Sequence, residues 1–314
     1  MAENGPGWER ETLERLAFAT LKEQRRTRFW GIFFKLLTFA YLSVLLAMLY
    51  NWGVDRERVH RGKHTALVEV QGVLEANGEA NADDITTGLQ NAFKDRNTQG
   101  VILRINSPGG SPVQAGIVYD EIRRLRTQYP NIPMYTVVED VCASGGYYVA
   151  AATDKIFVDK ASLVGSIGVR LDTWGFTGLM EKLGIERRAF SAGSNKDFLD
   201  PFKPLDAAQV KHAEAMLGQI HQQFIDVVKT GRGKRLKDDP DLFSGLFWTG
   251  ERSIELGLTD GYGTVESVAR DVIKAEEVVD FTRKENLAER FARKFGAGSA
   301  KAVVEALGGA ARVR

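Results

Sequence analysis

The segment Val141-Cys142-Ala143-Ser144-Gly145-Gly146-Tyr147-Tyr148 decides how the rest of this sequence is interpreted. The run 135–138 before it is typical of the end of a buried strand, and the small apolar residues 149–152 after it are typical of a packed helix. Ser144 therefore falls on a strand-to-helix turn, where its hydroxyl can project into a cleft beside unpaired helix amides. The other interpretation is that Ser144 only caps the helix and that the glycines only permit close packing.

Strand and helix patterns alternate on both sides of this turn. We expect strands at 66–70, 101–105, 134–138 and 185–190, an extended segment at 163–169, and helices at 83–94, 117–125 and 206–229. This alternation predicts an α/β fold with a parallel sheet and right-handed crossovers. Ligands of such sheets bind beyond the carboxyl ends of the strands. We therefore expect the Ser144 turn to lie beside the loop that follows the strand at 101–105.

That loop is rich in glycine and has the sequence Asn106-Ser107-Pro108-Gly109-Gly110-Ser111-Pro112. It does not match a phosphate-binding loop, because no Gly-Lys-Ser or Gly-Lys-Thr follows it. A tight turn explains Pro108 and Gly109. Gly110 is less clearly needed for the turn, and a backbone amide offered to a substrate carbonyl is one reason for a glycine there.

An apolar segment precedes this body. Residues 29–52 carry a single charge, Lys35, and the aromatic residues Trp30, Tyr50 and Trp52 lie near the ends, as in a membrane-spanning helix. A cleaved signal peptide and a buried core helix are the alternatives. We favour an uncleaved anchor, because no small-residue cleavage site follows and the polar stretch before it is long for a signal peptide. Basic residues flank both ends of the segment. Counting Lys35 with the N-terminal side gives that side the larger number, which favours a cytoplasmic N-terminus.

The chain then divides by composition. We expect a cytoplasmic polar tail at 1–28, a transmembrane anchor at 29–52, a charged linker at 53–64, one domain at 65–280 and a basic tail at 281–314. The basic tail is compatible with lying on a membrane, with packing on the domain, or with being loose.

Composition also excludes several classes of function. The formal net charge of +1, from 42 basic and 41 acidic residues, gives no overall field for nucleic acid, and no nucleic-acid partner is expected. Cys142 is the only cysteine, which excludes an internal disulfide and a cysteine-based metal site. We expect Cys142 to be a buried small hydrophobe rather than a nucleophile.

The histidines give no metal site either. His60 and His64 end the linker and are expected to be solvated. His212 and His221 are nine residues apart on one predicted helix, which is not a metal-ligand spacing, so we expect both at the surface. No metal or cofactor is therefore expected.

A serine nucleophile needs a base, and lysine can take the place of histidine in that role. The histidines lie away from the predicted strand ends, which disfavours a Ser-His-Asp triad. A lysine base must be neutral, and this requires burial among apolar or small neighbours. Lys196, among small residues in the loop 191–198, has the most suggestive setting, although most loop lysines are simply solvated.

Several short motifs follow one another along the chain, and together they are more specific than any one of them. They are Ile105-Asn106-Ser107-Pro108-Gly109-Gly110, Ala143-Ser144-Gly145-Gly146-Tyr147-Tyr148, Val164-Gly165-Ser166-Ile167-Gly168-Val169, Gly193-Ser194-Asn195-Lys196-Asp197, Phe247-Trp248-Thr249-Gly250 and Leu256-Gly257-Leu258-Thr259-Asp260-Gly261. This set resembles signal peptide peptidase A, a family of membrane-anchored serine-lysine peptidases. The resemblance spans about residues 65–275 and fits the short form, with one catalytic unit per chain. The polar N-terminal tail and the basic C-terminus depart from the family pattern.

The resemblance implies the parallel-sheet fold of the Clp protease and crotonase superfamily. It implies Ser144 as the nucleophile, Lys196 as the general base and Ser166 as the residue that orients the lysine amine. The amides of Gly110 and Gly145 would form the oxyanion hole. For the short form we expect the serine and the lysine of one site to come from one chain.

The resemblance also implies substrates, partners and a location. Remnant signal peptides and other apolar peptides would be cut through an acyl-enzyme beside the membrane. The chain would form a dome-shaped homo-oligomer, an octamer, with its catalytic domain on the periplasmic side of a bacterial-type inner membrane. Two other functions stay open: a crotonase-type acyl-CoA enzyme, which shares the fold, and a membrane scaffold without catalysis.

Overall fold

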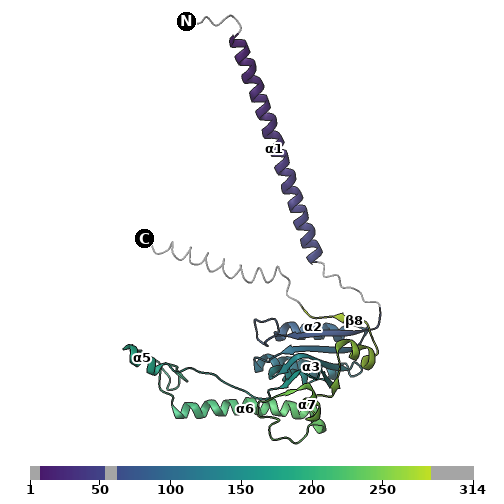
Figure 1. The fold of residues 1–314 in the computed structure, drawn as a ribbon, viewed down its shortest axis with the longest axis vertical. Coiled ribbons are helices and arrows are strands. Elements are labelled where there is room, and N and C mark those ends of the chain that lie inside the picture. The colour runs from purple at the N-terminus through teal and green to yellow at the C-terminus, as the bar shows by residue number, and fades with distance from the viewer. Residues whose placement is uncertain (1–7, 54–61, 284–314) are drawn as a thin grey trace. The chain divides into compact units, whose positions relative to one another are not determined.

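The computed structural model describes residues 8–53 and 62–283, and the chain divides into two compact units, residues 1–59 and 60–314. The described part of the first unit is one continuous helix, α1 (Trp8–Gly53) (Figure 1). Its stretch Lys22–Leu46 has a mean hydropathy of 1.8 and buries none of its side chains. Among the described residues, this is the one helix whose length and composition suit a membrane span. The expected border between a tail at 1–28 and an anchor at 29–52 falls inside this single helix.

The second unit, the body, is built on an 8-stranded sheet. Its strands are β1 (His64–Gln71), β2 (Thr98–Ser107), β3 (Met134–Ala143), β4 (Lys155–Val158), β5 (Leu163–Gly165), β6 (Phe247–Thr249), β7 (Gly261–Tyr262) and β8 (Val278–Asp280). Its α-helices are α2 (Ala82–Lys94), α3 (Pro112–Gln128), α4 (Gly145–Ala150), α5 (Thr177–Leu183), α6 (Ala207–Arg232), α7 (Gly250–Glu255) and α8 (Val265–Ser267). A 3₁₀ turn at 233–235 and a π-helical turn at 268–273 complete the set.

The sheet has the predicted parallel α/β character. The strand order is β6-β5-β3-β2-β1-β8, and β4 pairs with both β3 and β7. The strand pairs are parallel, except that β5 and β6 run antiparallel. The expected strands at 66–70, 101–105 and 134–138 are the buried parts of β1, β2 and β3, which confirms the fold class.

Both faces of the central strands are covered, as a parallel sheet requires. Val68 and Leu103 point into a large core that α2, α3, α4 and α6 share. The alternate residues Leu67, Ile102 and Val137 point into a smaller core closed by the helical segment 265–273. This double cover is why these strands have continuous apolar runs in the sequence.

His64 begins β1 and is fully buried, so the expectation of a solvated linker histidine is wrong for this residue. Its ring stacks on Phe281 at 5.8 Å, and its Nδ1 lies 3.1 Å from the Gly62 carbonyl oxygen. The linker composition concealed this, because the burial comes from a chain segment more than 200 residues away. His60 lies outside the described residues.

The segment 170–206, which we call the arm, buries none of its residues. It folds on itself: Phe176 stacks on Phe202 at 5.5 Å, and Arg187 pairs with Asp200. It is tied to the start of α6, where the Gln209 side chain accepts a hydrogen bond from the Leu199 amide at 2.9 Å. Figure 1 shows α5, in the arm, at the end of α6 that points away from the sheet.

The expected strand at 185–190 is wrong. These residues lie within the arm and are irregular and exposed. Their apolar residues suit a strand, but the arm offers no strand edge to pair with. By contrast, the expected helix at 206–229 is confirmed as α6, with Asp206 as its N-cap.

A buried ion pair fixes the other end of α6 to the sheet. Nη1 of Arg232 lies 2.7 Å from Oδ2 of Asp260, and its Nε donates to the Gly257 carbonyl at 2.9 Å. The same carboxylate accepts the Ile156 amide of β4 at 2.8 Å. Burial alone would raise the pKa of Asp260, but the hydrogen bond and charge of Arg232 outweigh it and hold the pKa below its ordinary value.

We expect Asp260→Ala to lower the free energy of unfolding by about 3–5 kcal/mol, because it leaves the Arg232 guanidinium buried without its charge partner. Since the folded-state pKa of Asp260 is depressed, its contribution is present above the unfolded value, near pH 4, and is lost as the pH falls through the folded value. Chemical denaturation of the full chain in detergent at pH 7 and at lower pH measures both effects. The control is Asp239→Ala, whose 3.3 Å pair with Arg252 is far more exposed, and which should cost less than about 1 kcal/mol.

Candidate functional site

Ser144 lies between the last residue of β3 and the first residue of α4. Its backbone has φ 50° and ψ −121°, a region that non-glycine residues rarely adopt and that costs about 1–3 kcal/mol. Its side chain makes no capping hydrogen bond to α4, so the interpretation of Ser144 as a simple helix cap is not what the structure shows. The Ser144 amide donates to the Gly165 carbonyl at 2.9 Å, which holds the turn against β5.

The two glycine-rich loops meet at this turn, as expected from their places at strand ends. A Cβ on Gly109 would lie 2.6 Å from the Ser144 Cβ, and one on Gly110 would lie 2.2 Å from the Leu74 carbonyl oxygen. Both glycines have positive φ, 103° and 146°. A Cβ on Gly145 would lie 3.4 Å from the Gly110 nitrogen, so the two amides that could form an oxyanion hole are neighbours.

Those two amides are unpaired within the described part of the chain. The Gly145 amide is the first of α4, so no carbonyl of the helix can accept a hydrogen bond from it. At the other loop, Leu74 bonds with Gly109 and with Ser111, which leaves the Gly110 nitrogen between them without an acceptor. Two adjacent, unpaired donors suit an oxygen atom that gains negative charge.

A cleft of about 730 Å³ opens beside Ser144. Its lining combines the two glycine loops, the extended segment after β5, the middle of α6 and the loop before β6. The lining residues are Val73, Pro108, Gly109, Gly110, Pro112, Ala115, Ser144, Gly145, Tyr148, Ser166, Gly168, Val169, Arg170, Ile220, Gln223, Phe224, Ser244, Gly245 and Phe247. Arg170 is the one charged residue among them, and the rest of the lining mixes apolar side chains with serines, a glutamine and backbone groups.

Ser166 follows β5 and lies in the same cleft. Its φ is 50°, and its amide donates to the Leu246 carbonyl at 2.7 Å. The Gly168 amide donates a hydrogen bond to the Ser166 carbonyl at 2.9 Å, which closes a tight turn around Ile167. The sequence predicted an extended segment at 163–169; the structure has β5 followed by this strained turn.

His221 was expected at the surface, and this is wrong. It is half-buried on α6, and its Nε2 lies 3.1 Å from the Ile167 carbonyl oxygen, beside the cleft. His212 is exposed as expected, with its ring edge-on to Phe198 at 5.7 Å. The sequence signal for His221 was its place next to the apolar Ile220 on the predicted helix. In the structure Ile220 lines the cleft.

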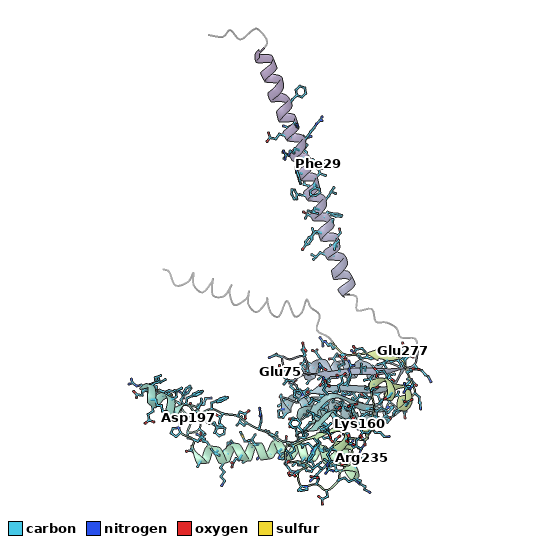
Figure 2. All side chains as sticks on the ribbon, in the orientation of Figure 1. Phe29, Glu75, Lys160, Asp197, Arg235 and Glu277 are labelled. Carbon is cyan, nitrogen blue, oxygen red and sulfur yellow. The ribbon has the colours of Figure 1, made fainter. Side chains whose placement is uncertain are left out.

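The structure brings Ser144, Ser166, Gly110 and Gly145 together around the cleft, but it does not bring Lys196 to them. Lys196 is exposed and lies in the arm, and Figure 2 labels its neighbour Asp197 there, away from the sheet. The expected pairing of serine and lysine within one chain is therefore not seen in the single chain.

The remaining candidates for reactive chemistry are limited. Cys142 is fully buried, and burial raises the pKa of its thiol, which fits the expected structural role. Across residues 8–53 and 62–283, no group of three or more His, Cys, Asp or Glu side chains is arranged to hold a metal ion.

Comparisons with known proteins show which proteins this chain resembles. Residues 126–279 match the model of peptidase family S49. A putative signal peptide peptidase SppA of Enterococcus faecium is 29% identical over 228 residues, 70% of this chain and 66% of that protein. Protease 4 of Haemophilus influenzae is 28% identical over 244 residues, 76% of this chain and 38% of that protein.

A protein of Brucella abortus named Na(+)/H(+) antiporter NhaA is 48% identical over 182 residues, 58% of this chain and 25% of that protein. The chain thus spans between a quarter and two thirds of the length of these relatives. These matches alone do not assign the activity of a whole relative to this chain.

The matched segment is that of a serine peptidase domain, within the expected domain 65–280. Over residues 126–279 this chain is therefore similar to peptidase family S49, and over a longer stretch it is similar to proteins named signal peptide peptidase SppA and protease 4.

We expect Gly110→Ala to lower the free energy of unfolding by more than about 1 kcal/mol, because the new Cβ meets the Leu74 backbone at a positive φ. Gly116→Ala is the matched control. An added Cβ there meets no atom within 4 Å, and in the interior of α3 it should stabilise by about 0.5–1 kcal/mol. Thermal unfolding followed by circular dichroism distinguishes the two, and equal shifts would contradict the tight contact at Gly110.

Proposed function

We propose that this protein is a membrane-anchored serine endopeptidase that hydrolyses apolar peptides through an acyl-enzyme. One observation carries the proposal: Ser144 is held uncapped and strained in a cleft, beside the unpaired amides of Gly110 and Gly145. Strain at a residue whose side chain is not used structurally is typical of a functional position. The proposed base is Lys196, and Ser166 orients its amine.

The proposed reaction uses these groups in order. Ser144 Oγ attacks the scissile carbonyl carbon while its proton passes to the neutral Lys196 amine, and the amides of Gly110 and Gly145 stabilise the oxyanion. Collapse breaks the C–N bond, and the lysine ammonium gives the proton to the leaving amine. Water then attacks the ester, Lys196 takes its proton, and collapse returns that proton to Ser144 as the new acid leaves.

We propose that Lys196 reaches Ser144 from a second copy of the chain. A lysine base needs surroundings that keep it neutral, whereas Lys196 is exposed in the single chain. The arm that carries it has many exposed large apolar side chains: Leu171, Trp174, Phe176, Leu179, Leu183, Ile185, Phe190, Phe202 and Leu205. Its own apolar hollow, about 440 Å³, lies between α5 and Phe202. Such a surface suits burial against another subunit, and we propose a closed homo-oligomer, an octamer by the family resemblance.

The substrates we propose are remnant signal peptides and other apolar segments. The cleft walls include Tyr148, Ile220, Phe224 and Phe247, whose side chains can contact the apolar side chains of a bound peptide. The α1 helix would hold the enzyme at the membrane that contains such peptides, and the tether raises their local concentration. We propose a bacterial-type inner membrane, with the N-terminus in the cytoplasm and the body on the outer side.

We expect Ser144→Ala and Lys196→Ala to lower cleavage of a fluorogenic apolar peptide at least about 1,000-fold in the full chain in detergent. Lys196→Arg is the matched control: it keeps the positive charge and should be equally inactive, because a guanidinium does not lose its proton. Rates equal to wild type in all three variants would refute the dyad. Binding of acyl-CoA thioesters without peptide cleavage would favour a crotonase-type enzyme. The absence of both peptide cleavage and thioester binding would favour a scaffold.

We also expect the two inactive variants to complement each other. If serine and lysine come from different copies, co-reconstituted Ser144→Ala and Lys196→Ala chains should recover about a quarter of the wild-type rate, since random mixing pairs two intact residues at that fraction of sites. Mixing after assembly should recover nothing until the subunits exchange, which is the control. No recovery after co-assembly would mean that both residues come from one chain.

A further inference from the structure

The turn from Gly165 to Gly168 carries two elements of the proposed site at once. The Gly165 carbonyl accepts the Ser144 amide at 2.9 Å, and the next residue, Ser166, is the proposed partner of the lysine amine. The turn has positive φ at Gly165 and Ser166, 110° and 50°, so it needs contacts from outside to stay in this form.

Two of those contacts come from the loop and strand at 244–249. The Leu246 carbonyl accepts the Ser166 amide at 2.7 Å. The Trp248 indole packs against Gly165 so closely that a Cβ there would lie 3.0 Å from the ring. These contacts hold the Gly165 end of the turn. The Ile167 end is contacted by a different element.

That element is α6, through His221. Its Nε2 lies 3.1 Å from the Ile167 carbonyl oxygen, and because a carbonyl only accepts, the ring nitrogen is the donor. Ile167 itself is fully buried. Three residues later on α6, Phe224 packs on Tyr148 at 5.2 Å, so the helix is fixed in register against the cleft at this point.

The same bond argues against His221 as a base. Its Nε2 hydrogen is committed to the Ile167 carbonyl, so this nitrogen has no lone pair to offer to Ser144. The imidazole therefore holds a backbone carbonyl rather than receiving a proton from Ser144.

We propose that His221 is a positioning residue of the peptidase site: its N–H donation to Ile167 fixes the turn that orients Ser166 and the Ser144 backbone. This inference rests on the proposed function. It also links α6, whose first turns hold the arm, to the turn on which the nucleophile rests.

The test compares His221→Leu, which removes the donor, with His221→Gln, whose amide nitrogen can occupy the Nε2 position. In the full chain in detergent, with the fluorogenic apolar peptide, we expect His221→Leu to lower kcat about tenfold with KM within about twofold. His221→Gln should restore most of kcat. Gln219→Leu, an exposed change on the same helix, is the control and should match wild type.

Amide hydrogen exchange gives a readout that does not depend on cleavage. The amides of Ser166 and Gly168 should exchange faster in His221→Leu than in wild type or His221→Gln, while those of α3 stay unchanged. Unchanged kcat and exchange in His221→Leu would overturn the proposal, and so would a His221→Gln variant as inactive as Ser144→Ala, which would make His221 the base. If the wild type cleaves no peptide, the proposed function fails, and the exchange comparison still decides whether His221 holds the turn.

Discussion

The hydrogen bond from the Ser144 amide to the Gly165 carbonyl is the contact on which the site depends. It joins two turns that each follow a parallel strand, β3 and β5, and each turn carries a serine with positive φ. Neither conformation is favourable for an isolated peptide. Besides this bond, the Ser144 turn packs against Gly109 of the glycine loop 106–112, and the Ser166 turn is held by the Leu246 carbonyl of the loop before β6. The strain at Ser144 is thus sustained by the sheet, which is why its hydroxyl is free of a structural role.

The position of α6 follows from a different kind of contact. At its C-terminal end the buried pair Arg232 and Asp260 ties the helix to β4, and at its middle Phe224 and His221 meet the cleft. Its first turns have no contact of this kind with the sheet and hold the arm instead. One end of α6 is therefore fixed to the core, and its other end adjoins the arm that contains Lys196, the proposed base.

Much of this fold was predictable from local patterns. The buried strands were visible as apolar runs, and the meeting of the two glycine loops followed from the rule that strand ends share one edge of a parallel sheet. The failures have a common cause. His64, His221 and the segment 185–190 were judged from their neighbours in sequence, but their surroundings are set by Phe281, by Ile167 and by the absence of a strand edge beside the arm. Contacts between distant segments leave no periodic trace in the sequence.

The arm leaves many large apolar side chains exposed. A chain that exposes Trp174 and Phe190 on a segment with no buried residue has not completed its own packing. If a second copy covers that surface, the burial that stabilises the assembly also surrounds Lys196, the proposed base. Peptidase activity would then appear only on assembly. An unassembled chain would then hold the strained Ser144 and two unpaired amides without the proposed base.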